Sequence, residues 1–201
     1  MLKHFLTGFL ALLLAPAFLV GDSVFIIDFE GLTDLETVTT QFPPLTFSNA
    51  AVLSAGLSLN EFEFPPHSGT NVVFDNSGPI SIDFGLFPAF SFGGFFTYLV
   101  PVTLEAFDFS ANLLGSVTSS FSSNLALSGD PGSSPNEFLG VGFPGGIARV
   151  TITGDPAGGS FTLDDLTADV SSTPIPEPGT LSLILLGGLA SARLRKRFFN
   201  R

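Results

Sequence analysis

Alternation of apolar and polar residues, broken at short intervals by turn-forming residues, is the feature that most constrains the fold of this 201-residue chain. At residues 102–106, Val, Leu and Ala share one face of an extended strand, while Thr103 and Glu105 occupy the other face. Residues 80–84 and 148–153 repeat this pattern, which is typical of half-buried antiparallel strands. No stretch between residues 22 and 172 shows a long period of 3.6 residues, so the pattern predicts no helix there.

Turn-forming residues divide this central body into many short predicted strands. The further predicted strands are residues 24–29, 58–64, 71–74, 90–97, 113–120, 138–143 and 160–168. Turns rich in Pro, Gly, Asn and Asp lie at residues 65–66, 76–79, 129–132 and 155–159. The spacing predicts an all-β fold, an antiparallel β-sandwich that is jelly-roll-like, with about eight to ten strands. We expect phenylalanine side chains to fill the space between its two sheets.

The charge of the body excludes one large class of function. Between Asp22 and Thr173 the chain has 17 acidic residues and a single base, Arg149, which gives a net charge of −16. A surface of this kind repels the phosphates of nucleic acids and anionic lipids, so we expect no nucleic-acid partner. Divalent cations are its natural counter-charge.

Two residue types are too scarce to support common forms of chemistry. The chain has no cysteine, which excludes disulfides, thiolate metal sites and thiol catalysis. His67 is the one histidine of the body, which removes most zinc sites. A catalytic His67 also needs a nucleophile and an orienting acid, and no motif for them is present, so we interpret it as a turn residue.

Both ends of the chain are predicted to be targeting segments. Residues 1–21 have a basic start at Lys3 and His4, a short apolar run and small residues at Ala15 and Ala17, as in a secretory signal peptide with a signal helix. The alternative is a buried first helix of the domain. The predicted domains are therefore a signal peptide at 1–21, a β-sandwich at 22–172 and a tail at 173–201.

The tail has three parts in a fixed order. Pro176, Glu177 and Pro178 interrupt the chain, and an apolar run at residues 181–192 follows. The run is shorter than the roughly 20 residues that a membrane span prefers, so it predicts a short transmembrane helix. A basic cluster closes the tail and predicts a cytoplasmic C-terminus. The cluster consists of Arg193, Arg195, Lys196 and Arg197.

This tail resembles the PEP-CTERM sorting signal of exported bacterial proteins, and the match covers the last 28 residues. The resemblance implies recognition and removal of the tail by exosortase, an intramembrane enzyme, after transient anchoring in the inner membrane. It also implies a Gram-negative host that makes exopolysaccharide, in biofilm or floc, and delivery to the cell surface or extracellular matrix. The alternative is a plain C-terminal anchor that stays in the inner membrane.

The body resembles β-sandwich domains that accompany this signal, at residues 64–71, 102–115 and 161–166. These domains are similar to the galactose-binding-like jelly rolls of carbohydrate-binding modules. The resemblance supports the fold more than any activity. It leaves three functions open: a non-enzymatic surface or matrix protein, a carbohydrate-binding module that recognises exopolysaccharide directly, and, more distantly, an exported glycan hydrolase.

Four carboxylates form the best candidate site. Asp28 and Glu30 lie two residues apart at the end of the first strand, and Asp164 and Asp165 lie on the last strand. A jelly roll tends to bring its first and last strands together, so these groups can surround a structural Ca²⁺. The resembled modules hold a structural calcium in a comparable place. Consecutive strand residues point to opposite faces, however, so Asp164 and Asp165 converge only if a bulge intervenes. The alternative is that all four are surface carboxylates.

A sugar-binding face needs an aromatic platform, and the body offers few candidates. Tryptophan is absent and Tyr98 is the only tyrosine, so Tyr98 is the predicted stacking residue. Phe87 and Phe90 are the other candidates. Paired carboxylates can in principle hydrolyse glycosides, but among 17 acidic residues some pair always looks suitable. We therefore expect no enzymatic activity.

Overall fold

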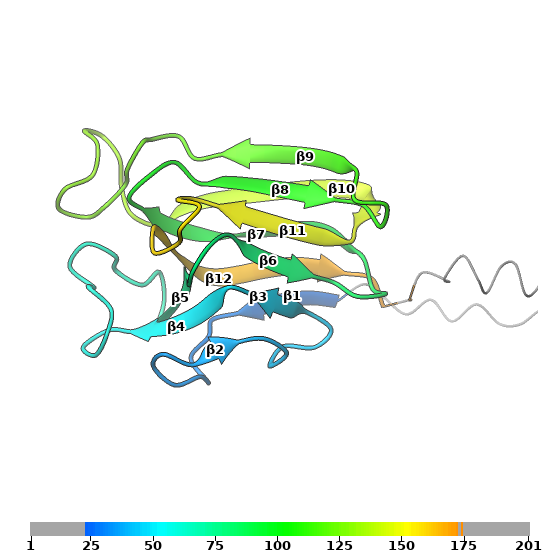
Figure 1. Cartoon of the computed structure of the whole chain (residues 1–201), viewed down its shortest axis with the longest axis horizontal. Coiled ribbons are helices and arrows are strands. Elements are labelled where there is room, and N and C mark those ends of the chain that lie inside the picture. Colours follow the sequence, from blue (N-terminus) through cyan, green and yellow to red (C-terminus); the bar gives the residue numbers. More distant parts are fainter. Residues whose placement is uncertain (1–22, 173, 175–201) are drawn as a thin grey trace, which may run out of the picture.

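The part of the chain that the computed structural model describes, residues 23–172 and 174, contains twelve β-strands (Figure 1). In chain order the strands are β1 (Ser23–Ile27), β2 (Thr37–Val38), β3 (Thr46–Ser48), β4 (Ala50–Ser54), β5 (Asn71–Asp75), β6 (Ile80–Asp83), β7 (Ala89–Tyr98), β8 (Thr103–Phe107), β9 (Leu113–Thr118), β10 (Glu137–Ile147), β11 (Arg149–Thr153) and β12 (Phe161–Val170). No helix occurs within these described residues. The predicted signal helix and tail helix lie outside them.

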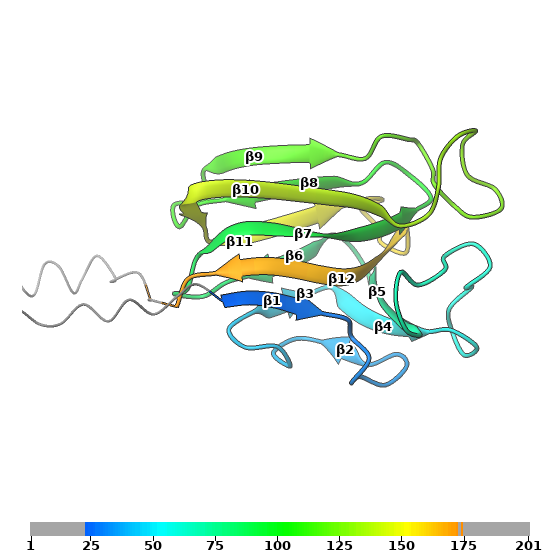
Figure 2. The same ribbon diagram turned by 180° about the vertical axis from the view of Figure 1, so that it is seen from behind.

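The strands form two packed sheets, which confirms the predicted antiparallel sandwich. One sheet has the order β10-β7-β12-β5-β4-β2, with β1 also paired to β12, and the other has the order β3-β6-β11-β8-β9. Figure 2 looks onto the larger sheet, with β10, β7, β12 and β1 in front. Strand β1 pairs antiparallel with β12 from Ser23 opposite Val170 to Ile27 opposite Leu166. The first and last strands are thus neighbours, as expected.

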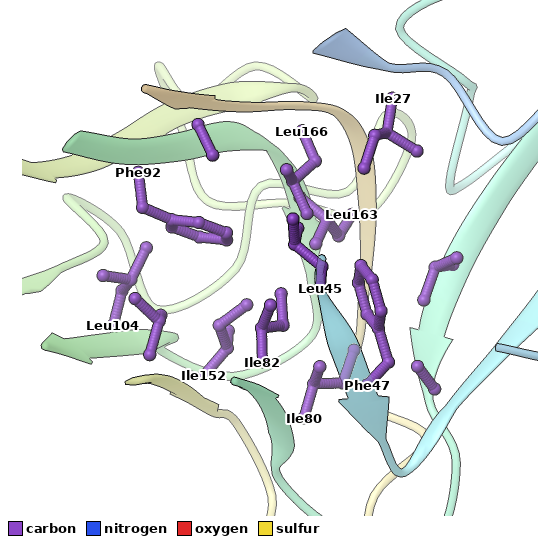
Figure 3. Packing of buried hydrophobic residues seen from close by; sticks show 14 of the residues in the cluster. Ile27, Leu45, Phe47, Ile80, Ile82, Phe92, Leu104, Ile152, Leu163 and Leu166 are labelled. Atoms are coloured by element: carbon purple, nitrogen blue, oxygen red, sulfur yellow. The ribbon is translucent and has the colours of Figure 1, made fainter. Parts of the chain in front are cut away.

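Alternating side chains of both sheets meet in one hydrophobic core (Figure 3). Phe84, Phe92, Phe96 and Phe161 are fully buried in it, so phenylalanine does fill the space between the sheets. The buried core residues run from Ile27 to Val170. The body therefore contains its own core, and we expect residues 22–172 to fold without either end of the chain.

One predicted strand is wrong and three strands were not predicted. Residues 58–64 form turns in which the Asn60 carbonyl accepts the N–H groups of Glu63 and Phe64. Strands β2 and β3 have two and three residues, too few to display a period. Strand β4 is buried on both faces except at Leu53, so its sequence does not alternate.

Candidate functional site

Asp164 and Asp165 lie where β12 changes its neighbour. Thr162 and Leu163 pair with β5, whereas β12 pairs with β1 from Leu166 onward. Between Asp164 and Thr167 the register with β7 shifts, and Asp165 has a φ of 43°. This is a β-bulge, the feature that two consecutive carboxylates need in order to reach the same loop.

The two carboxylates hold the loop at residues 65–70. Asp164 Oδ2 accepts the backbone N–H groups of His67 and Ser68 at 2.7 and 2.9 Å. Asp165 accepts the His67 Nδ1–H at 2.6 Å and the Ser68 hydroxyl at 2.8 Å. Burial raises the pKa of Asp164 to about 6, although the backbone hydrogen bonds oppose this rise. The pair therefore fixes the loop to the sheet.

Glu30 holds the other end of the same loop. Its carboxylate accepts the N–H groups of Thr70 and Asn71, both at 2.7 Å, and the Thr70 hydroxyl at 3.1 Å. Burial alone would raise its pKa, but these hydrogen bonds outweigh it and keep the pKa below its usual value. Gly69 lies directly beneath with a φ of 52°, where a Cβ would overlap the Glu30 carboxylate. Glycine is therefore required there.

The predicted calcium site at these four carboxylates stays a prediction, and the loop already uses three of them. Glu30, Asp164 and Asp165 are occupied by hydrogen-bond donors of the loop, and Asp28 accepts the N–H of Glu30 at 3.2 Å. Across residues 23–172 and 174, no three Asp, Glu, His or Cys side chains are grouped so as to hold a metal ion. A calcium ion requires six to eight oxygen ligands, so calcium binding here would have to displace these loop donors.

Calcium binding itself stays a prediction that a melting experiment tests. Because the oxygens already accept hydrogen bonds, we expect residues 22–172 to melt at the same temperature in EDTA and in millimolar calcium. Differential scanning calorimetry measures this directly, with magnesium as the control for ionic strength. A melting temperature that rises with calcium alone would restore the predicted metal site.

The prediction that Tyr98 stacks on a sugar is wrong. Tyr98 is fully buried at the end of β7, and its hydroxyl donates to the Glu137 carboxylate. Burial raises the pKa of Tyr98 to about 12, with Glu137 adding to the rise. Its ring belongs to the core and offers no face to a ligand.

An exposed aromatic face lies instead on the outer side of the larger sheet. Phe138, Gly140 and Gly142 of β10 are exposed there, while Leu139 between them is buried. Pairing places Phe138 opposite Phe95, Gly140 opposite Gly93 and Gly142 opposite Ser91. With Thr167 of β12, these strands line a groove of about 290 Å³, which we call the glycine groove. The alternation of apolar and polar residues that predicts β10 as a strand does not indicate which of its faces is exposed.

Phe138 lies over the floor of the glycine groove. A Cβ added to Gly93 would lie 2.5 Å from the end of the Phe138 ring, and one added to Gly140 would lie 3.0 Å from it. The ring meets Phe95 edge-on at 5.4 Å, and the His67 imidazole stacks on Phe95 at 3.5 Å. Phe138 nevertheless stays 55% exposed. The sheet thus presents an aromatic ring to solvent beside a floor without side chains, a surface suited to flat ligands with apolar faces.

The tail has a counterpart among known protein families. Residues 174–197 match the PEP-CTERM protein-sorting motif. The chain carries this sorting signal. It is therefore an exported protein targeted to exosortase, with a C-terminal sorting signal that anchors it in the membrane before processing. Pro176, Glu177, Pro178 and the basic cluster at 193–197 fall within the match but outside the described residues.

The body is similar to several solved structures. The K2 cleaved adhesin domain of Lys-gingipain is similar at 14% identity and a TM-score of 0.46, covering 73% of this chain and 97% of that one. A family 6 carbohydrate-binding module follows at 12% identity and 0.36, covering 75% and 94%. A module solved with β-1,4-galactotriose has 15% identity and 0.33, covering 65% and 88%. No curated protein matches the chain.

Within residues 23–172 and 174, no helix is long and apolar enough to cross a membrane. The predicted span at residues 181–192 lies outside the described part, so it stays a prediction.

Proposed function

We propose that this exported chain is a non-enzymatic protein of the cell surface or extracellular matrix, whose sandwich binds exopolysaccharide through the glycine groove. The observation that carries this proposal is the Phe138 ring, half exposed and lying over Gly93 and Gly140. An aromatic ring on a flat floor can stack against the C–H face of a sugar. The sorting signal supports this location, since it marks the chain as an exported protein.

The arrangement of His67 and Ser68 supports a role without catalysis. Both side chains contact Asp165, His67 through Nδ1 and Ser68 through its hydroxyl. A nucleophilic serine needs the imidazole itself as its base, with the acid on the far side of the ring. Here the carboxylate takes both donors, which favours a loop anchor rather than a catalytic triad.

The acidic charge of the body favours a second candidate, a matrix protein that contacts polymer through bridging cations. Only Arg149 offsets the acidic residues of the body, and it lies over the Phe107 ring on the smaller sheet. A cation-bridged contact would weaken in EDTA and at high salt, whereas stacking on Phe138 would change little. Binding measured with and without EDTA, and at low and high salt, therefore distinguishes the two candidates.

Co-sedimentation of purified residues 22–172 with the host's own exopolysaccharide tests the proposal. We expect saturable binding in both calcium and EDTA, weakened at least tenfold by Phe138→Ala because the stacking surface is lost. Phe109→Ala is the matched control, since Phe109 is 49% exposed on the β8–β9 hairpin, away from the groove. Equal binding by both variants would contradict the proposed surface, and binding lost in EDTA would favour the cation-bridged role.

A further inference from the structure

The glycine groove continues into a second hollow on the same sheet. Phe90, Phe143 and Pro144 line this hollow with Asp169, and its volume is about 560 Å³. Gly142 lines both the groove and the hollow, so the two are contiguous. From Phe138 to Phe143 the surface follows β10 for about 17 Å. A ligand that occupies both must therefore be an extended chain.

Asp169 differs from the carboxylates that anchor the loop. Pairing places it between Val24 of β1 and Ser91 of β7, both exposed on the outer side of the sheet. Its Oδ1 atom is buried and has no hydrogen-bond partner, alone among the buried side-chain polar atoms of the described residues. Buried acceptors in native proteins are nearly always paired. Asp169 therefore keeps acceptor capacity that no described residue uses, and a ligand can reach it through the part of its side chain that lines the hollow.

The surroundings of Asp169 decide what kind of donor fits. A metal ion needs several oxygen ligands, and the described residues provide no such group. Phe90, Phe143 and Pro144 instead offer apolar surface next to a single acceptor. A sugar ring matches both, because it has C–H faces and hydroxyl donors.

The charges near the groove limit which kinds of polymer can bind there. Arg149 is the one lysine or arginine among residues 23–172 and belongs to β11 of the smaller sheet. The His67 imidazole, which stacks on Phe95 beside the groove, is held by the Asp165 carboxylate. Asp165 and Asp169 add negative charge to this side of β12. A uronate or another anionic polymer would be repelled.

Resting on the proposed function, we propose that the ligand is an uncharged glycan chain that runs along β10. One sugar ring stacks on Phe138, and a hydroxyl group of a ring further along donates to Asp169. Asp169 is then the polar residue that selects the ligand, and Gly142 is the floor between the two positions.

Isothermal titration calorimetry of residues 22–172 with soluble galactan, glucan and mannan tests this, with polygalacturonate as the anionic probe. Asp169→Asn is compared with Asp83→Asn, which alters an exposed aspartate of the smaller sheet. Gly142→Val fills the floor, where a Cβ would have no neighbour closer than 3.6 Å. Gly115→Val is its control, since a Cβ at Gly115 would have no neighbour within 4 Å. Melting curves show that each variant is folded.

We expect binding of at least one uncharged polymer, no binding of polygalacturonate, and affinities reduced at least tenfold by Asp169→Asn and Gly142→Val but not by the controls. This inference would be overturned if an uncharged polymer bound through Phe138 with the same affinity in Asp169→Asn and Gly142→Val as in the unchanged protein. That result would leave the proposed function intact. Tighter binding of polygalacturonate would overturn this inference as well. Binding of none of these polymers, nor of the host exopolysaccharide, would contradict the proposed function itself.

Discussion

Replacing Phe96 with alanine is expected to lower the free energy of unfolding of the body by about 3–5 kcal/mol. Phe96 is fully buried on β7, between β10 and β12, and its ring lies 6.0 Å from that of Phe161. Transfer of the ring to water accounts for about 1.5–3 kcal/mol. The remainder arises from the cavity, because two hydrogen-bonded sheets cannot close around the lost ring.

Thermal and urea unfolding of residues 22–172 measure this effect. A domain is commonly stable by only about 5–15 kcal/mol, so the melting temperature should fall by roughly 10 °C or more. Phe62→Ala is the control, since Phe62 is 72% exposed and its loss should change stability by less than about 0.5 kcal/mol. A drop of less than about 1 kcal/mol for Phe96→Ala would contradict the sandwich core described above.

Replacing Asn124 with alanine is expected to lower the free energy of unfolding by about 3 kcal/mol, although the change removes a polar side chain rather than an apolar one. The Asn124 side chain is fully buried and joins the loop after β9 to the end of β7. Its Oδ1 accepts the N–H of Tyr98 at 2.7 Å, and its Nδ2 donates to the carbonyls of Phe96 and Ser134 at 2.8 and 3.1 Å. Alanine leaves the buried Tyr98 N–H without this acceptor and opens the loop to water.

Asn112→Ala is the matched control for this substitution. Asn112 lies in the exposed turn between β8 and β9, where its Nδ2 donates to Asp108 at 2.9 Å. Water replaces that hydrogen bond, so we expect a change below about 0.5 kcal/mol in chemical unfolding. Similar losses for the two variants would show that burial of Asn124 does not set its contribution.

The candidate site was predictable only in part, and the reason is geometric. The sequence correctly indicated that Asp164 and Asp165 converge only through a bulge, and the structure has one at that position. What the carboxylates bind depends on residues 65–71, which are far from them in sequence, and those residues fill them with N–H and O–H donors. A metal shell and a loop anchor need the same acidic residues, so composition does not separate them.

The aromatic residues show the same limit. Tyr98 is the only tyrosine and its ring is amphipathic, so the sequence favours it as the residue that stacks on a sugar. In the structure it is fully buried at the end of β7. Phe138 belongs to a residue type that is usually buried, and only the pairing of β10 with β7 shows that glycines lie beneath it. Asp169 looks like any other strand carboxylate until its unpaired oxygen is located.

The sequence by itself determined the fold class and the sorting signal, because both depend on patterns among residues that are close together in the chain. A period of two residues needs only a few positions to mark a strand, and the tail motif at 174–197 is continuous. The tertiary structure decided which strands pair, which face of the larger sheet stays open and which acidic groups are already bonded. These depend on residues as far apart in the sequence as Ser23 and Val170, which meet only when the sheets form, and no local pattern records them.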